Sequence, residues 1–82
     1  MNRVKLLFFA TLRDRAGTKS MEMDLPSDLT VQGLKEKISQ EYPSLRDSMS
    51  SVLITINREY AFDEAVIPEN AELAMFPPVS GG

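Results

Sequence analysis

One amphipathic segment in the middle of the chain limits the possible folds more than any other feature. Its apolar residues recur at spacings of three and four and so form a single stripe along a helix: Val31, Leu34, Ile38 and Tyr42. Thr30 suits the N-cap, and Tyr42-Pro43 ends the helix because a residue before proline avoids helical backbone angles. Gly33 weakens such a helix by roughly 1 kcal/mol relative to Ala, which close packing on a sheet would justify.

Segments on both sides of this helix alternate between apolar and polar residues, which is typical of strands. The expected strands are 3–12, 21–25, 52–56, 60–62 and 72–76. A turn over 14–20 containing Gly17 joins the first two into a hairpin, and a short helical turn is expected over 45–49. We therefore predict an α+β fold, with an N-terminal β-hairpin, one main helix and two or three further strands in a mixed sheet. The expected organisation is one domain over 1–82, with 77–82 as a flexible, extended tail.

Composition excludes most catalytic chemistry. The 82 residues include no Cys and no His, which removes thiolate nucleophiles, imidazole bases, disulfides and nearly all zinc sites. No Asp-rich loop suggests an oxygen-ligated metal, so we expect no metal site and no cofactor bound by this chain. The net charge of −3 argues against nucleic acid as a partner, and Arg13 and Arg15 are interpreted as a solvated loop. No apolar run approaches the length of a membrane span, so we expect no membrane partner and a cytoplasmic protein.

Several apolar side chains do not fit the core of such a sheet. Leu7, Phe9, Leu53 and Phe76 are expected on the face opposite the helix, near Tyr60. Scattered apolar residues are normal on protein surfaces. Two aromatic residues and two leucines on one sheet face, which a domain with one helix cannot cover, instead favour a docking patch.

The last residues of the sequence are Phe76-Pro77-Pro78-Val79-Ser80-Gly81-Gly82. A terminal glycine pair can simply be a frayed end. With no other reactive group evident, the α-carboxylate of Gly82 becomes the candidate reactive group, because glycine leaves the acyl carbon open to attack. Pro77-Pro78 favours an extended conformation, and the six residues after Phe76 could reach roughly 20 Å. That reach is sufficient to enter the active site of a docked partner, which would have to activate the carboxylate, most simply with ATP.

These patterns resemble the small subunit of molybdopterin synthase over essentially the whole chain. The resemblance rests on 4–13 with its Phe8-Phe9-Ala10 strand, on Gly17, Thr30-Val31, Tyr42-Pro43-Ser44-Leu45 and Asn57, and on the ending 76–82. It implies a ubiquitin-like β-grasp fold and a sulfur carrier in molybdenum cofactor biosynthesis. It also implies that partner proteins contact Phe9, Tyr60, Phe76 and the tail residues Pro77, Pro78, Val79 and Ser80.

The resemblance further implies a reaction sequence. An E1-like adenylyltransferase would adenylate Gly82 with ATP, and a sulfurtransferase would convert it to a thiocarboxylate, Gly81 giving access to the narrow active sites. The large subunit, in a heterotetramer of two small and two large subunits, would then use this sulfur to convert cyclic pyranopterin monophosphate to molybdopterin. Two cycles are needed per product, since a dithiolene carries two sulfurs.

Three alternatives share the expected fold. One is the sulfur carrier of the thiamine pathway, although those chains look shorter and usually lack Pro-Pro before the final residues. Another is a ubiquitin-like protein modifier, whose carboxylate is joined to a lysine amine. The third is an interaction module with an inert tail. Fold does not decide between these functions.

Overall fold

The computed structural model describes residues 1–78, and the predicted roles of Val79, Ser80, Gly81 and Gly82 concern residues outside this range. The helices and strands, in chain order, are β1 (Asn2–Phe8), α1 (Thr11–Ala16), β2 (Ser20–Leu25), α2 (Val31–Glu41), α3 (Pro43–Arg46), β3 (Leu53–Ile56), β4 (Glu59–Tyr60) and β5 (Glu72–Phe76).

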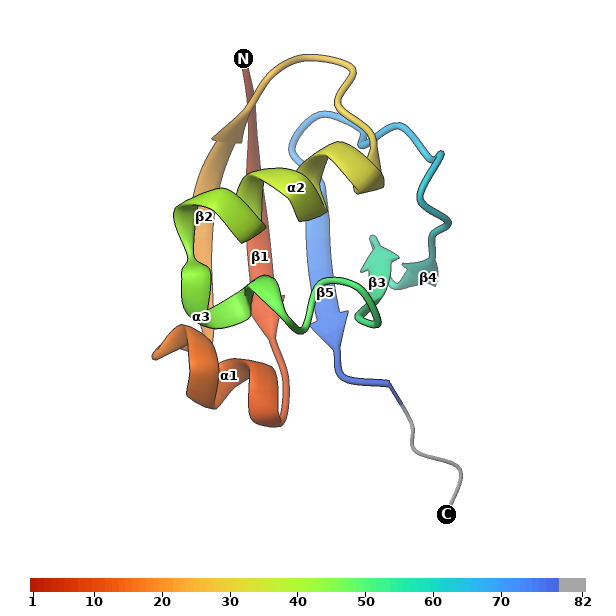
Figure 1. Cartoon of the computed structure of the whole chain (residues 1–82). Coiled ribbons are helices and arrows are strands. Elements are labelled where there is room, and N and C mark those ends of the chain that lie inside the picture. The colour runs from red at the N-terminus through yellow and green to blue at the C-terminus, as the bar shows by residue number, and fades with distance from the viewer. Residues whose placement is uncertain (79–82) are drawn as a thin grey trace.

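The five strands form one mixed sheet in the order β2-β1-β5-β3-β4. β1 is antiparallel to β2 and parallel to β5, while β3 is antiparallel to both β5 and β4. The three helices lie on one side of the sheet, with α2 crossing it (Figure 1). This arrangement is the β-grasp fold and confirms the predicted α+β class.

The helix α2 begins and ends as its sequence predicts. The Thr30 hydroxyl oxygen accepts a hydrogen bond of 3.2 Å from the Gly33 amide, and Thr30 itself is extended. At the other end the Tyr42 amide donates to the Ile38 carbonyl at 2.8 Å. Gly33 does lie in close packing, but against a side chain rather than the sheet. A Cβ at Gly33 would lie 2.5 Å from the Leu29 Cδ1 atom.

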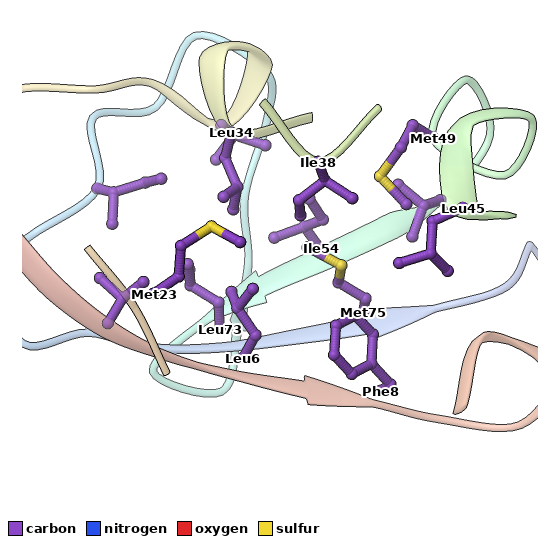
Figure 2. Close-up of a cluster of buried hydrophobic side chains, with 14 of the residues drawn as sticks. Leu6, Phe8, Met23, Leu34, Ile38, Leu45, Met49, Ile54, Leu73 and Met75 are labelled. Atoms are coloured by element: carbon purple, nitrogen blue, oxygen red, sulfur yellow. The ribbon is translucent and has the colours of Figure 1, made fainter. Parts of the chain in front are cut away.

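The core fills the space between α2 and the sheet. Figure 2 shows Leu34 and Ile38 of α2 pointing toward the side chains of the strands, with Leu45 and Met49 beside them. The sheet contributes every second residue of its strands to this core, as a pleated strand requires: Val4, Leu6, Phe8, Met23, Leu25, Ile54, Leu73 and Met75. The predicted phase of β5 is therefore confirmed.

The first strand is shorter than predicted. It ends at Phe8 rather than Leu12, and Thr11–Ala16 forms α1 where we expected strand and turn. Leu12 continues the alternation of apolar residues in the sequence, yet it is buried from the helix instead. The helix ends at Gly17, whose positive φ of 77° and amide bond to the Arg13 carbonyl form a left-handed C-cap.

Two short elements also differ from the prediction. The helical turn expected over 45–49 is α3, which begins two residues earlier because Pro43 suits the first helical position. The fourth strand covers Glu59–Tyr60 rather than 60–62, since the tight Asn57-Arg58 turn starts the return strand sooner. Phe62 lies outside the strand and is 83% exposed.

Two loop carbonyls accept hydrogen bonds from the backbone amides at the start of α2. The Val31 amide donates to the Ala65 carbonyl at 2.9 Å, and the Gln32 amide donates to the Asp63 carbonyl at 3.0 Å. Two of the amides that a helix start leaves without partners are thus used. Within residues 1–78, no helix is long and apolar enough to cross a membrane.

Candidate functional site

The sheet face that the helices leave uncovered, here called the outer face, carries the predicted apolar residues. Strand pairing places Leu7 beside Ala74, and Thr55 lies opposite both Ala74 and Tyr60. Two residues further along β5, Phe76 is paired with Leu53 of β3. Four strands therefore contribute to one continuous surface, although their residues are up to about 70 positions apart in the sequence.

The two aromatic rings at the end of β5 are stacked. The ring centroids of Phe9 and Phe76 are 4.6 Å apart, with an angle of 10° between the ring planes. The Phe9 amide donates to the Met75 carbonyl at 3.2 Å, which extends the parallel pairing of β1 and β5 by one residue. Stacked aromatic pairs contribute about 0.5–1.5 kcal/mol beyond their buried area. The pair thus stabilises the position of Phe76, the last strand residue before the tail.

A strained turn follows Phe9. Ala10 has φ 53° and ψ −130°, values that suit glycine far better than a residue with a Cβ atom. The Leu12 amide donates to the Phe9 carbonyl at 3.1 Å across this turn. The turn directs the chain from β1 into α1 and leaves the Phe9 ring on the outer face, 41% exposed.

A groove of about 420 Å³ crosses the outer face. Its lining residues come from β1, β3, β4, β5 and the turn between β3 and β4: Leu7, Phe9, Thr55, Arg58, Tyr60, Glu72, Ala74 and Phe76. Most of this lining is apolar, while Tyr60 is 77% exposed and brings a hydroxyl group to one side. A groove with an apolar floor and a few polar groups at its border suits a protein segment.

Charged residues cover the outer face beyond the groove. Lys5 is paired with Glu22 on one side and with Glu72 on the other. Arg3 donates to Glu22 at 2.8 Å and to Asp24 at 3.1 Å. The hydrogen bond with Glu22, together with the nearby Asp24 charge, raises the pKa of Arg3 above its ordinary value. The outer face is therefore apolar near the end of β5 and charged at its opposite end.

All the predicted patch residues lie on this face, and their contact with a partner stays a prediction. Leu53 is 37% exposed and lies on the face through its pairing with Phe76, although it does not line the groove. Pro77 and Pro78 line a second hollow of about 290 Å³ with residues of α1 and of the segment after α3. Pro77 and Pro78 thus lie beside α1 where the chain leaves the end of β5.

Within residues 1–78, no three acidic side chains come together as a possible metal site. A polar hollow on the helix side includes Lys35, whose ammonium group pairs with Asp63 at 2.7 Å. This pair joins α2 to the loop after β4. We assign it a structural role.

Sequence reasoning missed four residues of the groove: Thr55, Arg58, Glu72 and Ala74. The alternation within β3 and β5 places Thr55 and Ala74 on the outer face, but neither side chain is large and apolar, so the sequence did not indicate them as docking residues. Arg58 reaches the groove only because of the turn geometry between β3 and β4, which the Asn57-Arg58 pair could have indicated.

The chain is similar to proteins of one named group. The model of the ThiS family matches residues 6–82. The molybdopterin synthase sulfur carrier subunit of Dictyostelium discoideum is 36% identical over 84 residues, covering 99% of this chain and 98% of that protein. The subunit of the same name from Arabidopsis thaliana is 35% identical over 79 residues, covering 96% of this chain and 82% of that protein.

Solved structures support the same fold. A Pyrococcus furiosus protein provisionally assigned as subunit 1 of molybdopterin converting factor has a TM-score of 0.85 and 26% identity, covering 96% of this chain and 100% of that one. A structure of SAMP1 from Haloferax volcanii has a TM-score of 0.82 and 28% identity, covering 99% of this chain and 100% of that one. The chain therefore belongs to the ThiS family and to the family of molybdopterin synthase sulfur carrier subunits.

Proposed function

We propose that this chain carries sulfur on Gly82 as the small subunit of molybdopterin synthase. An E1-like adenylyltransferase joins the Gly82 carboxylate to AMP from ATP, releasing pyrophosphate. Hydrosulfide-equivalent sulfur from a sulfurtransferase then displaces AMP and leaves a thiocarboxylate. Inside the large subunit the thiocarboxylate donates its sulfur to cyclic pyranopterin monophosphate. We also propose a cytoplasmic location.

One observation carries this proposal: the apolar groove adjoins the end of β5, the strand that leads into the Pro77-Pro78 tail. A partner that covers the groove would lie close to the start of the tail. The roughly 20 Å that six extended residues can span would then bring Gly82 into that partner's active site. The names of the relatives, sulfur carrier subunits of molybdopterin synthase, support the same role.

The chemistry suits glycine and needs little from the rest of the chain. An unbranched acyl carbon is open to attack, and the backbone freedom of Gly81-Gly82 lets the end enter a narrow channel. Binding energy from the groove residues can hold the carboxylate in place while the partner supplies all catalytic groups. Gly81 and Gly82 act as the reacting segment, and Phe9, Tyr60, Phe76, Pro77, Pro78, Val79 and Ser80 act in docking and guidance.

Intact-mass spectrometry tests the proposal. The chain is incubated with ATP, the activating enzyme and a sulfur source, and its mass is expected to rise by the difference between a sulfur and an oxygen atom. A chain lacking Gly82 is the matched control, and it should fold normally and keep its mass. No mass change in the full chain, with partners shown to be active on another carrier, would refute sulfur carriage. Co-purification with the large subunit then identifies the pathway.

A protein modifier is the second candidate, and the likeness to SAMP1 favours it. In that role the activated carboxylate of Gly82 forms an amide with a lysine of another protein, and AMP leaves. Immunoblotting of cell extracts distinguishes the two roles. A modifier gives additional bands of higher mass that disappear when Gly82 is deleted, whereas a dedicated sulfur carrier gives the free chain alone.

A further inference from the structure

Arg58 occupies a backbone position that does not suit it. Asn57 and Arg58 both have positive φ, 50° and 75°, and form the two-residue turn between β3 and β4. Asn tolerates this conformation, but the second position of such a turn strongly favours glycine. A residue with a long side chain is strained there by an amount that glycine would avoid. The turn alone therefore does not explain the presence of arginine.

The turn is held firmly against the neighbouring strand. The Asn57 amide donates to the Glu72 carbonyl at 2.8 Å, and the Asn57 side-chain oxygen accepts from the Glu72 amide at 2.9 Å. The Ala61 amide also donates to the Ile54 carbonyl at 3.0 Å. Because these bonds fix the backbone on both sides of Arg58, they also fix the direction in which its side chain starts from the Cα atom.

This direction brings Arg58 to the border of the groove, where the apolar and charged parts of the outer face meet. It lines the groove together with Tyr60 and Glu72. The strand register places Glu22, Lys5 and Glu72 side by side along this border, with alternating charge. Arg58 follows Asn57, which is hydrogen-bonded to Glu72 at the end of this row, and it adds a positive charge next to the apolar floor.

The guanidinium group of Arg58 forms no ion pair with the described residues of its own chain. The ion pairs found within residues 1–78 involve Arg3, Lys35 and Lys37, and none involves Arg58. Glu72 is the register neighbour of Lys5 in β1, and no ion pair found within residues 1–78 involves its carboxylate either, so Glu72 does not occupy the Arg58 guanidinium group. An arginine presents a planar array of donors that matches a carboxylate in two-point contact.

We infer that Arg58 is a specificity-determining residue, which binds a carboxylate of the partner protein at the border of the groove. The inference rests on the proposed function, which supplies the partner: the large subunit of molybdopterin synthase. The apolar floor would hold an apolar part of the partner, and Arg58 would select a partner with an acidic side chain beside it. A charge at the border of an interface acts mainly on partner choice and association rate.

The test compares Arg58→Gly and Arg58→Gln with the wild-type chain in binding to the purified large subunit. Arg58→Gly should raise Kd about five- to tenfold at low salt, mostly through slower association, and the difference should shrink in 0.5 M salt. Its urea midpoint should be unchanged or higher, because glycine relieves the positive φ. Lost binding with retained or increased stability separates a role in recognition from a structural one.

Arg46→Gln is the matched control, since it removes the same charge from α3 on the other side of the sheet. Its Kd should stay within about twofold of wild type. Equal binding by wild type and both Arg58 variants would overturn the inference alone, as would an equal loss in Arg46→Gln. A wild-type chain that fails to bind the large subunit would instead overturn the proposed function, and this inference with it.

Discussion

Replacing Phe76 by alanine should affect partner binding more than folding. In the isolated chain the Phe76 ring is half-buried and stacked on Phe9, and Phe76 is paired with Leu53 of the neighbouring strand β3. Fully burying a side chain of this size contributes about 1.5–3 kcal/mol, and a half-buried ring realises roughly half of that on folding. With the loss of stacking added, we expect Phe76→Ala to lower the free energy of unfolding by about 1.3–3 kcal/mol. The domain should remain folded.

The part of the ring that is still exposed becomes buried when a partner covers the groove. Aromatic residues at the centre of an interface commonly contribute 2 kcal/mol or more, so Kd for the large subunit should rise at least about 30-fold. Calorimetric titration of the large subunit with each chain measures this, after urea unfolding has shown that both chains are folded at the working temperature. The effect should vary little with salt, which distinguishes it from the Arg58 variants.

Phe62→Ala provides the matched control. Phe62 is 83% exposed and lines a neighbouring hollow with Leu53 and Tyr60 rather than the groove itself, so its replacement removes the same ring beside the groove but outside it. We expect its Kd to change less than about twofold. Unchanged affinity for Phe76→Ala, or an equal loss for Phe62→Ala, would refute the assignment of the groove as the docking site.

Two further predictions concern stability. Ala10→Gly should raise the free energy of unfolding by about 0.5–1 kcal/mol, because the φ of 53° strains a residue with a Cβ atom. Ala16→Gly, in α1, is the control and should lower the free energy of unfolding. A lower free energy of unfolding in both variants would contradict the strain argument. Asn2→Ala should lower the free energy of unfolding by about 2 kcal/mol, because buried Asn2 accepts from the Asn70 amide at 2.8 Å and donates to the Pro68 carbonyl at 2.9 Å. Urea unfolding checks both, and a change of less than about 0.5 kcal/mol for Asn2→Ala would show that water replaces these bonds.

The sequence predicts those elements whose periodicity agrees with their burial. The stripe that includes Leu34 and Ile38 lies against the sheet, and β5 has the predicted bounds because Leu73 and Met75 alternate with more exposed residues. The helix α1 was missed because Leu12 fits either description. It continues the alternation of β1, yet it is buried as a helical residue once Ala10 has turned the chain.

The sequence predicted which large apolar residues lie on the outer face, but not how they are arranged in space. Alternation alone places Phe9 and Phe76 on the same face of their strands. Their stacking depends in addition on β1 and β5 being parallel neighbours, a pairing between segments 67 residues apart in the sequence. The position of Arg58 depends on backbone angles in a turn of two residues. Such features arise from tertiary structure, which periodicity does not encode.

The position of β5 in the sheet connects the fold with the proposed transfer of sulfur. β5 is the central strand, hydrogen-bonded to β1 on one side and to β3 on the other. Its alternate residues also serve two surfaces: Leu73 and Met75 lie in the core, while Ala74 and Phe76 line the groove. The tail therefore begins at a point that two strands, the core and the docked partner would all hold in place. For a carrier whose reactive group lies six residues further on, a fixed starting point limits the volume that this group must search, and so raises its effective concentration at the partner's active site.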